Sequence, residues 1–206
     1  GCKMQQVILI FFGWVLGVFS SIILEKQKRK QIKEDYKDSL ITELDLVYPR
    51  ILANYYEIIR EMGELNKEKL EWMHNMISKK NSKSLDDIDE HIIKILEKDN
   101  KEIILLNKKH QNIRTLSTKK FNLSFLLENI SSFSLLDKEF RHNAINIRTN
   151  INYLNDCIDK VEFFYKTTFV PDISENNYNV AYKNIENYYI NIADLCRSTS
   201  EMIVNI

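Results

Sequence analysis

The sequence predicts an all-α protein, and three observations support this prediction. Glycine and proline number only four and two among 206 residues, whereas sheet-containing folds need such residues at their turns. Apolar residues recur at the three- to four-residue spacing of amphipathic helices through most of the chain. The run Met4–Leu24 also holds 21 consecutive residues without a charge, which is long enough for a helix that crosses a bilayer.

These observations predict one N-terminal transmembrane helix that runs into a cytoplasmic helical bundle with a C-terminal antiparallel helical hairpin. The expected division is a membrane anchor at 1–24, a juxtamembrane helical stalk at 25–48 and the cytoplasmic helical bundle at 49–206. A cleaved signal peptide and a buried helix of a soluble protein are the other interpretations of the first segment.

The charges after Leu24 favour an anchor that is retained. Five cations lie within the nine residues that follow it, and positively charged flanks resist translocation. The predicted topology is single-pass in the cell membrane, with a short N-terminus outside and the C-terminal domain in the cytoplasm. We expect the five cations to contact anionic lipid headgroups; they are Lys26, Lys28, Arg29, Lys30 and Lys33.

Small residues repeat every four positions inside the apolar run. Gly13, Gly17 and Ser21 therefore share one face of the expected helix, where short side chains allow a second helix to approach closely. This face predicts self-association, or association with another membrane protein. The other interpretation is a chance pairing, because glycine is common in membrane helices.

A helical stripe should continue from the anchor through the stalk, with Ile32, Tyr36 and Leu40 among its apolar positions. Pro49 interrupts this stripe, so we expect a break or kink near Tyr48. The pattern then resumes over 51–77, and either one bent helix or two short helices fit it. After a polar connector at 79–83, Ser84 is the expected N-cap of the next helix.

Residues 103–113 carry helical spacing further, and 121–133 forms a short apolar segment. The last third predicts the hairpin, with Ser134 at the start of its first helix and Ser174 at the start of its second. We expect the hairpin to pack antiparallel and to dock on the helices around 50–116. Its apolar seams are Ile147, Ile151, Leu154, Ile158, Val161 and Tyr165, and Tyr178, Tyr182, Ile185, Tyr189, Ile192, Cys196, Thr199 and Ile203.

The sequence lacks the motifs of the common cofactor and metal sites. Gly63 is the only glycine between the apolar run and the C-terminus, which excludes glycine-rich nucleotide loops. The four histidines are isolated from one another in the sequence, and the carboxylates at 86–90 suit the start of a helix. Cys157 and Cys196 are expected in the core. Equal numbers of basic and acidic residues, 29 each, give no electrostatic reason to expect nucleic acid.

One segment, Phe140–Asn146, resembles the phosphoacceptor segment of some sensor histidine kinases. It has the order Arg-His-Asn with a further Asn four residues after His142. The resemblance implies a phosphoacceptor role for His142, whereas helical spacing alone predicts a surface histidine.

The sequence therefore predicts a membrane-anchored helical interaction protein, a scaffold, sensor or accessory, without catalytic activity and without a cofactor. Its expected partners are the lipid bilayer, a second copy or another membrane protein, and a cytosolic protein. The alternative is a membrane-acting effector that oligomerises through its transmembrane helix and perturbs the bilayer. An enzyme with an unfamiliar site is a third hypothesis.

Overall fold

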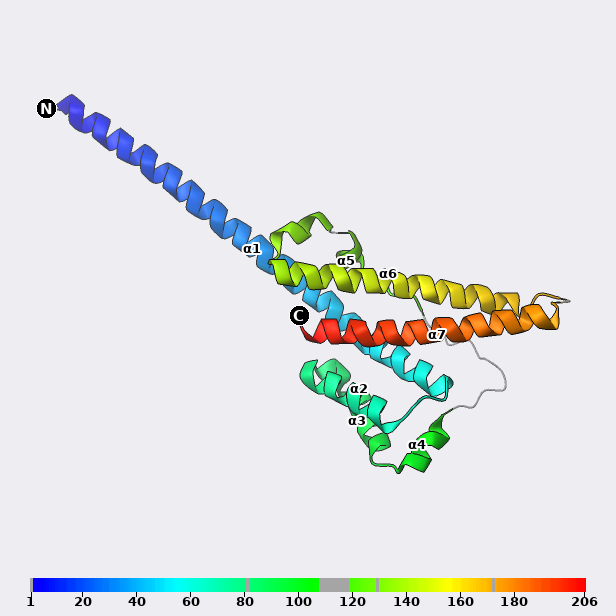
Figure 1. Ribbon diagram of the computed structural model, residues 1–206. Helices are drawn as coiled ribbons and strands as arrows, with labels where there is room; N and C mark the ends of the chain where they lie inside the picture. Colours follow the sequence, from blue (N-terminus) through cyan, green and yellow to red (C-terminus); the bar gives the residue numbers. More distant parts are fainter. Residues whose placement is uncertain (1, 81, 108–118, 129, 172) are drawn as a thin grey trace.

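The computed structural model describes residues 2–80, 82–107, 119–128, 130–171 and 173–206, apart from the side chains of 2–10, 12, 83, 127–128 and 130–132. The described residues form helices and connecting turns and contain no strand. This confirms the predicted all-α class. The first part of a long N-terminal helix projects from a body that contains the rest of this helix and the other helices (Figure 1).

Helix α1 (Cys2–Glu61) is one unbroken helix of 60 residues, with Pro49 inside it. Of the break or kink expected near Tyr48, the break is therefore wrong. Proline removes one backbone hydrogen bond and crowds the preceding turn. Here Tyr48 and Ile51, on either side of the proline, are both buried, and their packing opposes the opening of the helix at this point.

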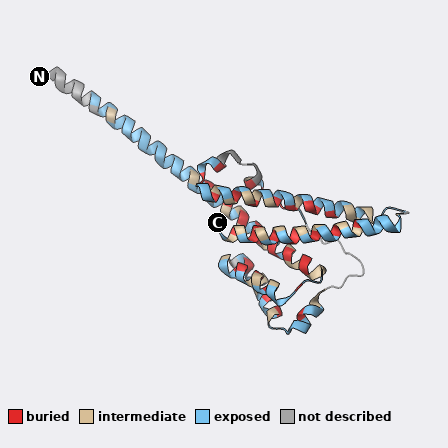
Figure 2. Cartoon of the chain, in the orientation of Figure 1, coloured by how far each residue is buried: buried red, intermediate tan, exposed pale blue. Residues whose placement is uncertain are grey.

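The core includes much of the segment that the sequence assigned to a separate stalk. Tyr36, Leu40 and Leu44 are buried together with the apolar residues that follow Pro49. Figure 2 shows this change along α1, from exposed residues to buried ones. The boundaries expected after residues 24 and 48 both lie within α1, and only its part before Tyr36 stands outside the core.

Helix α1 ends at Glu61, and Gly63 in the turn that follows has a backbone φ of +74°. The N–H of Gly63 donates to the Arg60 carbonyl (3.2 Å) and that of Glu64 to the Ile59 carbonyl (2.8 Å). This pair of bonds is the Schellman motif, which requires a left-handed residue and so favours glycine.

Short helices follow α1. They are α2 (Lys67–Lys80), the 3₁₀ turn η1 (Lys83–Leu85), α3 (Asp86–Leu96) and α4 (Asn100–Leu106). The expected cap at Ser84 is wrong, because Ser84 lies within η1 and Leu85 holds the N-cap position of α3 without a side-chain hydrogen bond. The carboxylates of Asp86, Asp87 and Asp89 do lie in the first turn of α3. Of the helix expected over 103–113, the part at 108–113 lies outside the described residues.

A strap crosses from the described residue 119 to α6 and contains α5 (Ser124–Glu128) and the 3₁₀ helix η2 (Ile130–Leu135). The carboxylate of Glu43, on α1, accepts hydrogen bonds from the backbone N–H groups of Phe125 (2.8 Å) and Leu126 (2.7 Å). The first N–H groups of a helix generally lack partners within their own helix. Glu43 therefore fixes the strap to α1.

The hairpin consists of α6 (Lys138–Thr167) and α7 (Glu175–Val204), which pack antiparallel (Figure 1). Ser174 caps α7, since its Oγ accepts a hydrogen bond from the Asn177 N–H (3.3 Å), as expected. The start expected at Ser134 is wrong: α6 begins at Lys138, after Asp137. Helix α7 packs on α1 and α2, and Cys157 and Cys196 are buried, as the sequence predicts.

Within the part of the chain that the structure describes, we find no helix with the length and apolarity that crossing a bilayer requires. The run Met4–Leu24, for which the sequence predicts such a helix, begins among residues whose side chains are not described (2–10 and 12).

Candidate functional site: the projecting part of helix α1

Residues 11–32 of α1 form the projecting segment, which extends away from the body (Figures 1 and 2). All of its described residues are exposed except the half-buried Val15. Its large apolar side chains include Phe11 and Trp14, which are 60% and 66% exposed. Such a continuous apolar surface is typical of a site that contacts lipid or another protein.

The three small residues of the predicted association face lie in the projecting segment. A Cβ atom added at Gly13 or Gly17 would meet no atom within 4 Å. The Ser21 hydroxyl donates to the Gly17 carbonyl (2.9 Å), so this hydroxyl is satisfied within its own helix. No other described part of the protein thus covers this face, and Ser21 is its one polar residue.

A shallow hollow of about 430 Å³ follows this face. Its lining includes Gly17 and Ser21, together with Trp14, Val18 and Ile22. The hollow ends at Glu25, where the charged part of the helix begins.

The five predicted lipid-contact cations have different surroundings. Lys26 and Lys28 are exposed. Arg29 and Lys30 make ion pairs along the same helix, Arg29 with Glu25 (2.6 Å) and Lys30 with Glu34 (3.8 Å). These pairs are solvent-exposed, so they hold their cations only weakly.

Lys33 differs because it binds the body. Its Nζ lies 2.6 Å from Oδ1 of Asp137, at the start of α6. This contact lowers the pKa of Asp137 below its usual value, with a smaller contribution from Lys37. One turn further along α1, the Nζ of Lys37 lies 4.8 Å from the ring centroid of Phe140. The fifth cation of the cluster is therefore engaged in a tertiary contact.

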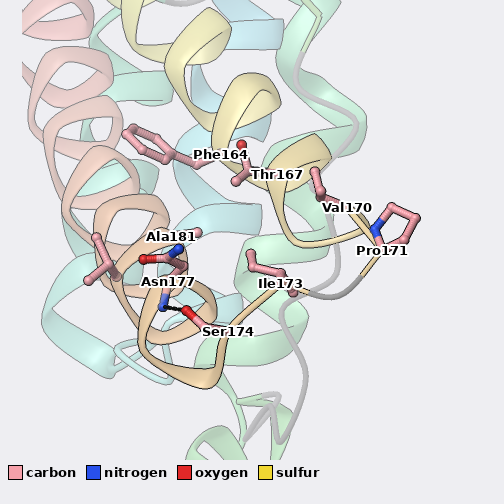
Figure 3. Close-up of a pocket in the computed structure, with 9 residues that line it drawn as sticks. Phe164, Thr167, Val170, Pro171, Ile173, Ser174, Asn177 and Ala181 are labelled. Atoms are coloured by element: carbon pink, nitrogen blue, oxygen red, sulfur yellow. Dashed lines mark hydrogen bonds between the residues drawn. The ribbon is translucent and has the colours of Figure 1, made fainter.

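A second hollow, of about 530 Å³, lies at the far end of the hairpin (Figure 3). Phe164 and Thr167 line it from α6, Asn177 and Ala181 from α7, and Pro171 from the turn. Exposed apolar side chains surround this end of the hairpin; they are Phe163, Phe169, Val170, Tyr178 and Val180.

The sequence does not reveal this hollow. Tyr178 was expected in the hairpin seam but is exposed, and Ala181 is buried in its place. Ala181 and Phe164 both line the hollow. A turn is ordinarily polar, but the turn around Pro171 contains several apolar residues. This composition is the sequence signal for an exposed apolar surface at that end of the hairpin.

The histidines make separate contacts. Nδ1 of His74 lies 2.7 Å from Oδ1 of Asp89 and joins α2 to α3. The His91 ring lies edge-on to Tyr56, with the centroids 5.7 Å apart. His142 is exposed and its Nε2 lies 3.1 Å from the Asn146 amide nitrogen, and His110 lies outside the described residues. Among the described side chains, no three His, Cys, Asp or Glu residues are grouped to hold a metal ion.

Comparisons of this chain with protein families, with curated proteins and with solved structures found no match.

Proposed function

We propose that the protein is a single-pass, membrane-anchored helical interaction protein, a scaffold or sensor accessory rather than an enzyme. Residues 4–24 insert into the bilayer, and the body built on the rest of α1 recruits a cytosolic protein partner. The N-terminus lies outside and the body lies in the cytoplasm, because the basic cluster after Leu24 resists translocation.

One observation carries the proposal. The uncharged run and the centre of the body belong to the same helix, α1, and the described apolar side chains of the run stay exposed except that of Val15. Exposing this much apolar surface to water is unfavourable, and a bilayer removes it from water. Because α1 continues from the run into the core, the bilayer would hold the body through a rigid helical connection.

The exposed aromatic residues at the far end of the hairpin support a role in interaction. Aromatic side chains are enriched at protein interfaces, and Phe163 and Phe169 are 62% and 67% exposed. This end lies opposite the projecting segment (Figure 1), so an anchored molecule would present it away from the bilayer.

The open face at Gly13 and Gly17 supports a second candidate function, a membrane-acting effector that assembles through this helix. Small residues allow close approach of membrane helices. In such an effector the assembled helices would perturb the bilayer, whereas in the tethered interaction protein a second copy or another membrane protein would pack there without leakage.

The two tryptophans provide a direct test of insertion. Trp14 is the central residue of the 21-residue run, and the chain has only one other tryptophan, Trp72 in α2. In the Trp72→Phe protein Trp14 is the only tryptophan, and we expect its fluorescence emission to shift to the blue when the protein is reconstituted in vesicles. Quenching should be strongest with lipids that are brominated near the ends of their acyl chains. Vesicles loaded with a self-quenching dye report leakage in the same preparation.

The Trp14→Phe protein is the matched control, and its Trp72 emission should not respond to brominated lipid. Leu16→Lys places a charge in the middle of the run and should prevent insertion, because a central lysine opposes membrane insertion. Trp14 emission that is the same with and without vesicles would contradict the proposal. Dye leakage that Gly13→Ile abolishes would favour the effector.

A further inference from the structure

The contact between Lys33 and Asp137 joins two parts of the molecule at its surface. Lys33 belongs to the basic cluster of α1, and Asp137 directly precedes α6. Their side chains are 33% and 67% exposed, and the Nζ–Oδ1 distance is 2.6 Å. An ion pair that is exposed to this degree is weak, so a competing partner of modest affinity can replace it.

Asp137 also stands where a helix-capping residue ordinarily accepts a hydrogen bond. It holds the N-cap position of α6 with an extended backbone (φ −59°, ψ 152°), yet its side chain makes no cap hydrogen bond. The N–H groups at the start of a helix lack partners within the helix, and an Asp at the N-cap ordinarily accepts from one of them. The carboxylate therefore has an alternative acceptor role whenever Lys33 leaves.

Lys33 has a second partner if the chain is anchored as proposed above, and the inference rests on that proposal. Lys33 follows Leu24 by nine residues, which is about 14 Å along a helix. The headgroup layer extends about 5–8 Å beyond the hydrocarbon, and the long lysine side chain can reach toward it. The surface potential of anionic lipids acts over about 8–10 Å at physiological salt.

We propose that Lys33 exchanges Asp137 for anionic headgroups, while Asp137 turns to cap α6, so that lipid charge controls this contact. A lysine near an anionic leaflet and an exposed ion pair gain similarly small free energies, and a change in lipid composition can therefore shift the balance. On neutral lipid Lys33 ties α1 to the start of α6. On anionic lipid this tie is released, and the packing of Tyr36 and Leu40 in the core still holds the body on α1.

A double-mutant cycle tests the exchange. The full chain with Trp14→Phe is reconstituted in nanodiscs of neutral or anionic lipid at the same salt concentration. Trp72 packs on Tyr55, with the ring centroids 4.9 Å apart, and its fluorescence reports unfolding of the body in urea. For Lys33→Gln and Asp137→Asn, we expect a coupling factor of about 2–5 in the unfolding equilibrium constant in neutral lipid and close to one in anionic lipid.

Lys120 and Asp159 form the control pair. Their Nζ–Oδ2 distance is 2.7 Å and their side chains are 56% and 47% exposed, but Asp159 lies far along α6 from Asp137. The coupling of the control pair should be equal in both lipids. The capping step has its own variant: in anionic lipid Asp137→Asn should behave like the unsubstituted protein, because Asn also caps. Asp137→Ala should raise the unfolding constant several-fold.

Coupling between positions 33 and 137 that is equal in both lipids overturns the inference and leaves the anchor standing. Coupling that is absent in neutral lipid overturns it as well, because the ion pair is then not formed. If the chain does not stay with the nanodiscs during flotation in a density gradient, the proposed function fails, and this inference fails with it.

Discussion

Tyr55 lies on the buried face of α1 and is only 3% exposed. Burial raises the pKa of its phenol from 10.0 to about 12, which the nearby Arg197 partly opposes. Tyr48 lies two helical turns before Tyr55 on the same face of α1. Its hydroxyl is buried without a described hydrogen-bond partner, and burial raises its pKa too. Both phenols stay neutral in the folded protein at pH values that ionise them in the unfolded chain.

This difference predicts a loss of stability in alkali. Above pH 10.0 the unfolded chain releases the Tyr55 proton while the folded protein keeps it up to about pH 12, so the free energy of unfolding falls as pH rises. Tyr55→Phe should flatten this slope by at most about 1.4 kcal/mol per pH unit. Urea unfolding between these pH values measures it. Tyr153→Phe, at an exposed site, should leave the slope unchanged, and an unchanged slope in Tyr55→Phe would contradict the prediction.

Asparagine side chains also act at this scale, because two of them hold irregular backbone. Asn155 accepts from the Phe121 N–H (2.8 Å) and donates to the Phe121 carbonyl (2.9 Å). Asn107 makes the same pair of bonds with Leu65, at 2.9 and 3.1 Å. Each side-chain amide thus bonds one backbone N–H and one backbone carbonyl of a residue outside the helices, where no helical hydrogen bond could satisfy them. The high asparagine content of the chain thus has at least two structural uses.

At the scale of elements, the end of α1 depends on one residue. Gly63 has a left-handed backbone, and the Schellman bonds around it turn the chain toward α2. A Cβ atom at Gly63 would meet nothing within 4 Å. A substitution there therefore changes the backbone energy and not the packing.

We expect Gly63→Ala to lower the free energy of unfolding by about 1–2 kcal/mol, because a residue with a Cβ atom is strained in this region. Gly63→Asn should cost less, since Asn tolerates the left-handed conformation better. The midpoint of urea unfolding should move while its slope stays the same. Equal midpoints for the Gly and Ala proteins would show that the left-handed turn is not needed.

The hairpin shows how tertiary contacts modify an element. Ile185, Tyr189 and Ile192 follow the predicted seam and are buried, whereas Tyr178 is exposed. Helix α7 is covered by α1 and α2 along its later part, and its first turns lie at the free end of the hairpin (Figure 1). The same apolar spacing therefore produces core at one end and an exposed surface at the other.

At the scale of the whole molecule, α1 has two parts with different support. Between Tyr36 and Ile59 most of its large apolar side chains are buried in the core, Leu46 being an exposed exception. Residues 25–32 are exposed. An isolated helix is marginally stable in water, and packing provides most of the stability of helices in proteins. The backbone hydrogen bonds of residues 25–32 should therefore open at a lower free-energy cost than those of the core part of α1.

Hydrogen exchange of the vesicle-bound protein measures this difference. We expect amides of 44–59 in α1 and 185–203 in α7 to exchange only through unfolding of the body. Amides of 25–32 should exchange many times faster, although they belong to the same helix. Equal protection along α1 would show that a second copy of the protein or the lipid covers residues 25–32 in the vesicle-bound state. Dilution of the protein in the vesicles separates these two causes.

The three serines expected to begin helices, Ser84, Ser134 and Ser174, show how far the sequence predicts helix starts. Ser174 caps α7 as expected, whereas α3 and α6 begin after Leu85 and Asp137, with Ser84 in a 3₁₀ turn. A serine offers the same local hydrogen bond in each case, so packing of the neighbouring turns decides whether it is used. The Lys33 contact was missed for a similar reason, since its partner lies 104 residues away in the chain.

The helical class, the hairpin and the buried cysteines follow from the amino-acid sequence by itself, because apolar spacing and the scarcity of glycine act within short stretches of chain. Tertiary structure alone decided that α1 passes Pro49 unbroken, that Tyr36, Leu40 and Leu44 are buried in the core, and that Lys33 binds Asp137. Each of these outcomes depends on which distant segments pack against α1. Such packing outweighs local preferences whose energies are small.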